Sequence, residues 1–564
     1  MDLIERNFRR LTQSSRRSAL VVFVLAAAAY AVLEATASFR DPDSFYHAEM
    51  ARVTWASGPV REFPWLPFTT LADAFADHHF LYHLLLGPFV SLLGPFYGLA
   101  TATVLFGAAA VAAFYLVTRA FGLRFGWAFT LLAATSVDLM FRLNLAKASS
   151  LAVILLLVGF VAAVRGRRWS VLGVAWLYVW AHGSWPLLPF VVLAVAVSAS
   201  LVSAFRADGR VRLVRRILSA LVSAESTGRV WSTFALCCLG SAAGLVANPF
   251  FPANLEFYWR QTVQVALVGL PAAVEFGVEW LPYSPLELLS QNGAMFVAVL
   301  LVAGGWVAAL LAGSRASRGR AEAAGAARNA VSLLSAAVVS AALLALTLHS
   351  RRHVEFLTPF MLLDAAIAFD WLLRRTDPRR LADFVFSRHP RLRTFAACYA
   401  VAALCLLPVR GYVLVHRSMR EGARDWSSFV AVGEWMRLHV PSGSVVFTGD
   451  WSDFPAIFLN FPAGRYVIGL DAGFLYLRDR TLYDEWRRLS SGEAGDRTAE
   501  RVAAAFDASY VLVRRDQVNL RNAVQSDPDL VPVYGDGQVE LFMRLRPADR
   551  TAAGTNDLLR NPSP

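Results

Sequence analysis

The sequence is poor in charged residues and in cysteine for its length. Of its 564 residues, 17% are charged and 56% are hydrophobic, whereas about a quarter of a soluble protein is charged. Cys237, Cys238, Cys398 and Cys405 all lie within apolar runs, and neither their placement nor their spacing indicates disulfides or a metal site. Most of the chain is therefore not a soluble domain.

Nucleotide-binding motifs are also missing. The sequence has no Walker A segment, no Gly-rich dinucleotide fingerprint and no Ser-centred hydrolase elbow, so we expect no nucleotide cofactor. The net charge of +12 comes from arginines in short clusters between apolar runs. Such clusters are typical of cytoplasmic loops in membrane proteins, and we expect no nucleic-acid partner.

Apolar stretches recur from Ala19 to about Val415 and predict a mainly α, polytopic transmembrane helical bundle in the lipid bilayer. We expect about eleven spans. They lie at 19–38, 97–118, 125–141, 148–164, 170–183, 186–205, 230–247, 291–313, 328–348, 354–373 and 394–415. Residues 80–96 could form another span or an interfacial helix.

The basic residues predict the topology. Arginines at 6, 9 and 10 precede the first span, so the amino terminus is expected in the cytoplasm. The basic loops at 119–124, 165–168, 206–216, 315–320 and 374–393 then share that side. An odd number of spans puts residues 416–564 outside.

Two domains are expected. Residues 1–415 would form the transmembrane domain, with a first external loop at 39–96, and residues 416–564 an external α/β domain. Buried strands are predicted at 444–447 and 510–513, and a helix at 499–506.

The first external loop holds the strongest candidate site. Asp41, Asp43, His47 and Glu49 directly follow the first span, with Pro42 fixing the backbone between the two acids. A helix starting near Ser44 would place Asp43 at its N-cap. The alternative is an ordinary capped interfacial helix.

Asp77, His78 and His79 lie further along the same loop. A carboxylate and imidazoles can share a proton or bind a divalent cation. One hypothesis is a Mg²⁺ or Mn²⁺ site at Asp43, Asp77 and His79. The alternative is that the adjacent histidines point to opposite sides and only one of them matters.

Basic residues on the same predicted side are candidates for phosphate binding. Arg351, Arg352 and His353 precede the tenth span, and the arginine fork suits phosphate oxygens. Arg142 and Lys147 admit the same interpretation. Lipid head-group contact without catalysis is the alternative. These polar residues on one side of the membrane suggest a cavity that opens outward. His182 could line this cavity, or it could be an ordinary hydrogen-bonded residue at a helix end.

The segment from Asp43 to Arg52, Asp-Ser-Phe-Tyr-His-Ala-Glu-Met-Ala-Arg, resembles the acidic first-loop motif of bacterial oligosaccharyltransferases, which belong to the GT-C class of membrane glycosyltransferases. The resemblance implies that Asp43 is the catalytic loop acid. Residues 451–455 stand in place of that family's Trp-Trp-Asp-Tyr-Gly acceptor motif and keep only one Trp and the Asp.

A further resemblance is to a group of bacterial membrane proteins of the same class. Its elements Asp-Pro-Asp-x-x-x-His, His-Gly, Asn-Pro and Arg-Arg-Asn/His have counterparts here in the same order. They are Asp41–His47, His182–Gly183, Asn248–Pro249 and Arg351–His353. The resemblance implies a GT-C-like fold in a bacterial cytoplasmic membrane.

We therefore expect an inverting glycosyl transfer on the external face, from a polyprenyl-phosphate-linked sugar to a glycan, lipid or protein acceptor. Asp43 would act as general base, or hold a metal and orient the acceptor, with support from Asp77 and from His78 or His79. Arg351, Arg352 and Lys147 would stabilise the leaving phosphate. The alternative is a transporter or flippase for lipid-linked glycans, although the sequence shows no convincing internal repeat.

Overall fold

The computed structural model describes residues 15–36, 38–206, 224–268, 274, 277–311, 320–376, 383, 385, 390–421 and 427–545. The arginines at 6, 9 and 10 and most of the predicted basic loops at 206–216 and 315–320 lie outside the described residues. The chain forms two compact units. The first comprises Met1–Thr36, His78–Phe251 and Val278–Gly422, and the second Ala37–Asp77, Pro252–Gly277 and Ala423–Pro564.

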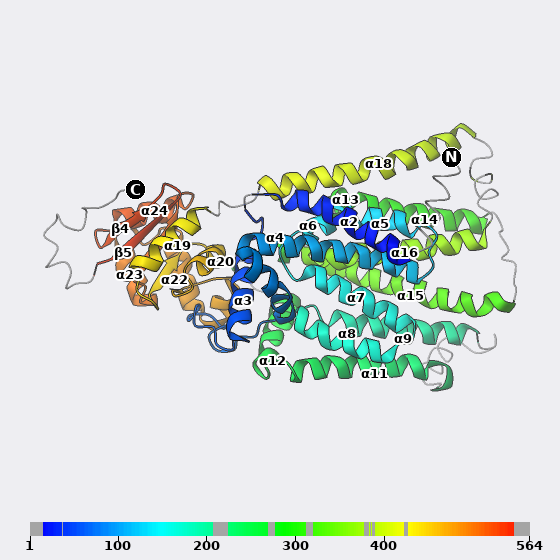
Figure 1. Cartoon of the computed structure of the whole chain (residues 1–564), viewed down its shortest axis with the longest axis horizontal. Coiled ribbons are helices and arrows are strands. Elements are labelled where there is room, and N and C mark those ends of the chain that lie inside the picture. The colour runs from blue at the N-terminus through cyan, green and yellow to red at the C-terminus, as the bar shows by residue number, and fades with distance from the viewer. Residues whose placement is uncertain are drawn as a thin grey trace. The chain divides into compact units, whose positions relative to one another are not determined.

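The first unit is a polytopic bundle of apolar helices (Figure 1). They are α2 (Ser15–Glu34), α4 (Phe80–Ala120), α5 (Gly126–Ala134), α6 (Val137–Leu143), α7 (Ser149–Val164), α8 (Arg168–Ala181), α9 (Leu187–Arg206), α11 (Ala224–Val246), α13 (Pro285–Gln291), α14 (Gly293–Leu311), α15 (Arg320–His349), α16 (Val354–Arg375) and α18 (Pro390–Glu421). Short 3-10 turns, η2 (Val278–Trp280) and η3 (Arg351–His353), join some of them.

Each predicted span overlaps one of these helices, and 125–141 is divided between α5 and α6. Within the described residues, 7 helices are long and apolar enough to cross a membrane. The bundle predicted from hydropathy is therefore confirmed, while the expected number of spans stays a prediction.

Residues 80–96 belong to a long helix. Helix α4 has 41 residues and breaks at Gly94, where φ is +81° and ψ is 168°. A straight helix of this length would rise about 60 Å, roughly twice the hydrocarbon thickness of a bilayer. The part after the break matches the predicted span at 97–118.

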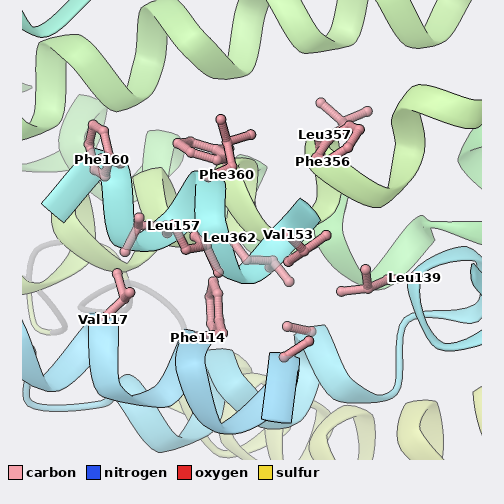
Figure 2. Close-up of a cluster of buried hydrophobic side chains, with 14 of the residues drawn as sticks. Phe114, Val117, Leu139, Val153, Leu157, Phe160, Phe356, Leu357, Phe360 and Leu362 are labelled. Carbon is pink, nitrogen blue, oxygen red and sulfur yellow. The ribbon is translucent and has the colours of Figure 1, made fainter. Parts of the chain in front are cut away.

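Helix α7 lies at the centre of the bundle core. Its side chains Val153, Leu157 and Phe160 face Phe114 of α4 and Phe360 of α16 (Figure 2). The Phe160 and Phe360 ring centroids are 5.5 Å apart in an edge-to-face arrangement, which aromatic pairs favour. The buried face of α7 therefore packs against both α4 and α16.

The second unit contains a five-stranded sheet in the order β2-β1-β3-β5-β4. The strands are β1 (Val445–Thr448), β2 (Arg465–Tyr466), β3 (Tyr510–Arg514), β4 (Leu530–Gly535) and β5 (Val539–Arg544). β1 pairs in parallel with β2 and β3, whereas β5 is antiparallel to β3 and β4. The two predicted strands are confirmed, as is the predicted helix at 499–506.

The sheet is accompanied by helices of the same unit (Figure 1). They are α19 (Ser427–His439), η4 (Trp451–Asp453), α20 (Phe454–Asn460), α21 (Gly473–Arg478), α22 (Arg480–Ser490), η5 (Gly495–Arg497), α23 (Thr498–Phe506) and α24 (Val518–Ser526). The segment before η2 adds α12 (Ala253–Tyr258) and η1 (Trp259–Val268).

Part of the first loop is built into this second unit. Its helix α3 (Asp43–Ser57) packs against α20. The backbone N–H of Tyr466 donates to the carbonyl of Trp65 at 2.7 Å, and the Trp65 and Phe458 ring centroids lie 4.9 Å apart. Residues 37–77 thus share a compact unit with the tail, while the predicted domain boundary at 415/416 stays a prediction.

Candidate active site

The first group of candidate residues lies at one end of the helical bundle, around the buried side chain of Arg142. This residue lies in the last turn of helix α6, and its guanidinium is held by two carboxylates. Nε donates to Glu355 Oε2 at 2.7 Å, and Nη1 donates to Glu279 Oε2 at 2.5 Å. An arginine with two acidic partners carries no net positive charge for a ligand, so Arg142 anchors the site.

Glu279 is the point at which the positive charges converge. Lys147 Nζ lies 3.7 Å from its carboxylate. Burial alone would raise the pKa of Glu279, but three cations hold it well below its usual range. These cations are Lys147, Arg142 and Arg352. Glu279 is therefore an anion held in a cationic environment.

Arg351 and Arg352 have different surroundings. Arg351 donates to Glu287 Oε1 at 2.6 Å and to the Pro282 carbonyl at 3.2 Å, so it fastens the segment after η2. Arg352 stacks over the Trp280 ring, with Cζ 4.1 Å from the centroid. Among the residues that the structure describes, Arg352 forms no ion pair. Arg352 is thus the better phosphate candidate of the two, a choice that the sequence left open.

Three histidines gather beside this group. The rings of His78 and His79 lie 3.8 Å apart, and the rings of His79 and His182 lie 5.2 Å apart. The adjacent histidines therefore do not point to opposite sides. Residue 183 is a glycine, and a Cβ there would meet His78 at 3.5 Å. His353 Nδ1 lies 3.2 Å from the Ser350 carbonyl.

His182 is held in its neutral form. The backbone N–H of Ser184 donates to its Nδ1 at 3.0 Å, and Ser184 Oγ is 2.7 Å from the same nitrogen. Because Nδ1 accepts this N–H, it carries no proton itself. The tautomer with its proton on Nε2 fits this geometry, so Nε2 can donate to a ligand.

The second group lies in the second unit, at the start of α3. The helix begins at Asp43, and Pro42 rather than Asp43 is its N-cap. Asp41 Oδ1 accepts the Asp43 backbone N–H at 2.9 Å. The predicted N-cap role of Asp43 is therefore wrong, because Asp41 satisfies the backbone one residue earlier.

The two ends of the predicted catalytic loop come together within this unit. Burial raises the pKa of Tyr46 well above its ordinary value, and the negative charges of Asp77 and Asp43 raise it further. Asp77 likewise contributes to the raised pKa of Tyr258, after burial. Both aspartates thus act on the same tyrosine hydroxyl, as expected if they share a site.

Glu49 and His47 are buried on the same helix. Glu49 is fully buried and accepts from Arg52 Nε and Nη2 at 2.8 and 2.6 Å. The His47 ring lies 5.5 Å from that of Tyr46. The bidentate ion pair gives Glu49 a structural partner within α3.

Residues 451–455, which stand in place of the acceptor motif, are packed into the second unit. Asp453 is fully buried and forms an ion pair with Arg514. Arg514 also reaches Asp450 at 3.2 Å and Asp516 at 2.9 Å. Trp451 packs against the core of the unit. The ion pair therefore fixes η4, which begins this segment, to the end of β3.

Several polar partners were not assigned roles from the sequence. Besides Glu279 and Glu355, Asp138 of α6 accepts from the Tyr283 hydroxyl at 2.8 Å and from Asn292 Nδ2 at 2.5 Å. An acid within an apolar run is the signal that could have identified it.

The metal hypothesis has no support in the geometry. Within the described ranges, no group of three or more His, Cys, Asp or Glu side chains could hold a metal ion. The proposed set of Asp43, Asp77 and His79 therefore stays a prediction, and no reaction step is derived through a metal.

No family model matches the chain, and no curated protein matches it. Among solved structures, arabinofuranosyltransferase AftD from Mycobacteria is similar over 94% of this chain, with 15% identity and a TM-score of 0.52. ArnT from Cupriavidus metallidurans in the apo state is similar over 94% of this chain and 98% of its own, with 13% identity and a TM-score of 0.50. Both are GT-C membrane glycosyltransferases.

This chain has a GT-C-like fold. It spans 40% of the length of AftD. At these identities the likeness shows the fold alone. The fold class predicted from the sequence, a GT-C-like helical bundle with a carboxyl-terminal α/β domain, is therefore confirmed.

Proposed function

We propose that this protein is a GT-C-type glycosyltransferase that uses a polyprenyl-phosphate-linked sugar donor. The observation that carries the proposal is that Lys147 and Arg352 converge on Glu279 at one end of the bundle of a GT-C-like fold, where Arg142 is already neutralised by two carboxylates. Clustered cations of this kind suit a phosphate group at a membrane surface.

Lys147 and Arg352 are the proposed phosphate ligands. Arg352 combines a guanidinium with an aromatic support in Trp280, and Lys147 lies 3.7 Å from an acid that a phosphate could replace. The charge on the phosphate grows as the sugar leaves, so these cations would stabilise the transition state more than the ground state.

The donor class is supported by one of the fold relatives. ArnT, whose apo form shares this fold, has also been solved bound to undecaprenyl phosphate. A lipid phosphate would reach the bundle from the bilayer, on the side where the cations gather. We propose the same class of lipid here.

On the acceptor side, Asp43 is proposed as the general base. The acceptor oxygen would form a bond to the anomeric carbon, and the bond from that carbon to the phosphate oxygen would break. The bonding electrons pass to the phosphate, the acceptor proton passes to Asp43, and the anomeric configuration inverts. Asp77 would support the base, since both acids act on Tyr46. His78 is a second proton-transfer candidate.

The acceptor is proposed to be a glycan, lipid or protein on the external face of a bacterial cytoplasmic membrane. The departure at 451–455 from the acceptor motif, and the burial of Asp453 in an ion pair, argue against recognition of a peptide sequon by that segment.

The test is release of polyprenyl phosphate by purified protein in lipid nanodiscs. A panel of polyprenyl-phosphate sugars and acceptors is supplied with and without a chelator. The parent should release lipid phosphate, whereas Asp43→Asn should lose at least about 100-fold of the rate, the usual minimum for a general base. Asp484→Asn, an exposed acid on α22, is the control.

Full activity of a folded Asp43→Asn protein would overturn the role of Asp43. Lipid binding with no release from any donor would instead favour the transporter, and flipping of the lipid in liposomes would then be measured.

A further inference from the structure

A second candidate binding site lies at the other end of the bundle. A cavity of about 260 Å³ opens between the last turns of α4 and α7 and the start of α8. Its walls are almost entirely apolar, and they include Leu116, Val117, Val158 and Val161. The cavity begins at Val158, nine residues after the start of α7 at Ser149, a rise of about 14 Å. This length separates the cavity from Lys147, so the two sites are distinct.

Arginines surround the mouth of this cavity. Arg165 and Arg167 line it directly. Arg229 lies against Gly166, where its Cδ would be 3.4 Å from an added Cβ. Arg168 stacks over Trp169 at 5.6 Å. Four arginines thus lie on the turn between α7 and α8 and on the facing part of α11, and two of them, Arg165 and Arg167, line the cavity itself.

Within the described residues, these charges have no carboxylate partner. No acidic side chain there forms an ion pair with any of the four arginines. Arg165 uses one nitrogen to donate to the Ala120 carbonyl at 2.5 Å. By contrast, Arg124 and Arg374 at the same end both pair with Asp370. The positive charge at the cavity mouth is therefore available to an external anion.

The neighbouring surface is suited to a membrane interface. Trp169 is 67% exposed beside the arginines, and tryptophan concentrates at the level of lipid head groups. Leu116 and Val158 are also exposed on the cavity side. The apolar groove suits the acyl chain of a phospholipid, and the aromatic and cationic rim suits its phosphate head group.

We propose that this cavity binds an anionic phospholipid, with one acyl chain in the groove and the phosphate held by Arg165 and Arg167. The cavity is smaller than the roughly 300–1,000 Å³ of drug-sized pockets, which suits one chain rather than a whole sugar-bearing lipid. Phosphatidylglycerol has a net negative charge, whereas the phosphate of phosphatidylcholine is balanced by its own quaternary ammonium group. The proposal does not depend on the transferase activity.

The test is native mass spectrometry of delipidated full-length protein titrated with phosphatidylglycerol or phosphatidylcholine. The parent should bind phosphatidylglycerol more tightly. Because each basic residue near an anionic lipid contributes roughly a factor of five, Arg165→Gln with Arg167→Gln should weaken binding by about 30-fold. Val158→Trp, which fills the groove and leaves the charges in place, should also weaken it. Arg375→Gln is the matched control, since this arginine stacks on Trp371 outside the cavity.

Equal binding of the two lipids would overturn the proposal. So would an unchanged affinity in the double variant, or an equal loss in Arg375→Gln. Competition by millimolar inorganic phosphate with no preference between lipids would show a simple anion site and would also overturn it. Melting temperatures of all variants, measured alongside, distinguish lost binding from lost folding.

Discussion

At the scale of single residues, the candidate site is a balance between cations and carboxylates. Arg142 is neutralised by Glu279 and Glu355, whereas Arg352 rests on an aromatic ring. Glu279 faces the same cations that a phosphate would need. The Glu279 carboxylate therefore competes with a lipid phosphate for these cations. When no phosphate is bound, it balances their charge.

This competition predicts the effect of removing one charge. Glu279→Gln should bind polyprenyl phosphate about tenfold more tightly, because a charge-assisted interaction of roughly 1.5 kcal/mol no longer opposes the lipid. Binding is measured by titration in nanodiscs. Glu256→Gln, on an exposed ion pair with Arg260 in the second unit, should change nothing. Weaker binding in Glu279→Gln would show that Glu279 supports the lipid rather than competing with it.

The sequence identified the basic residues around Glu279, but it did not show which carboxylate pairs with which base. Charged side chains at the ends of apolar helices are costly to desolvate. This cost is why the sequence indicated a function for Arg142, Lys147, Arg351 and Arg352. Which carboxylate neutralises which base depends on tertiary contacts, such as that between Arg142 and Glu355, which are 213 positions apart. The ranking of Arg352 over Arg351 also required these contacts.

At the scale of elements, hydropathy predicted the helices well because long apolar runs have few alternatives in a bilayer. The boundary predicted between residues 80–96 and 97–118 lies close to the break in α4, for which Gly94 and Pro95 are a sufficient local cause. Strands β2, β4 and β5 were missed. β2 has two residues and the edge strand β4 carries only a partly buried face, so neither gives a clear alternating pattern.

The break in α4 leads to a stability prediction. At φ +81° and ψ 168°, Gly94 occupies a region nearly reserved for glycine. Gly94→Ala should therefore cost about 1–3 kcal/mol of unfolding free energy through backbone strain alone, since nothing lies within 4 Å of its added Cβ.

Thermal unfolding in a mild detergent measures this cost. Gly304→Ala is the matched control, because Gly304 lies in the interior of α14 with an equally open Cβ position. A helical glycine replaced by alanine should gain up to about 1 kcal/mol. A Gly94→Ala protein as stable as the parent would show that the break relaxes without cost.

At the scale of the whole molecule, the assignment of residues 37–77 to the tail unit is the main feature that the sequence did not predict. Phe63 shows why: it is 1% exposed and packs on Phe75 of its own loop and on Phe454 and Phe458 of α20. These contacts join segments almost 400 positions apart, which no local pattern reveals.

Removing the Phe63 ring should loosen both segments together. Phe63→Ala should destabilise the second unit by about 3–5 kcal/mol, the usual cost of deleting a buried aromatic side chain. Amide hydrogen exchange should then accelerate in α3 and α20 and not in α7. Trp55→Ala, a 53% exposed aromatic residue on α3, is the control. Faster exchange in α3 alone would contradict the shared core.

The central claim is that cations at one end of the bundle hold the phosphate of a lipid-linked sugar. The most direct measurement is the rate of polyprenyl phosphate release by a Lys147→Gln, Arg352→Gln protein beside the parent in nanodiscs. The account predicts a loss of about 100-fold or more, since removing a single preorganised donor from such a site typically costs about 100- to 1,000-fold in rate. Circular dichroism would verify that the helices remain. Release at the parental rate would contradict the claim.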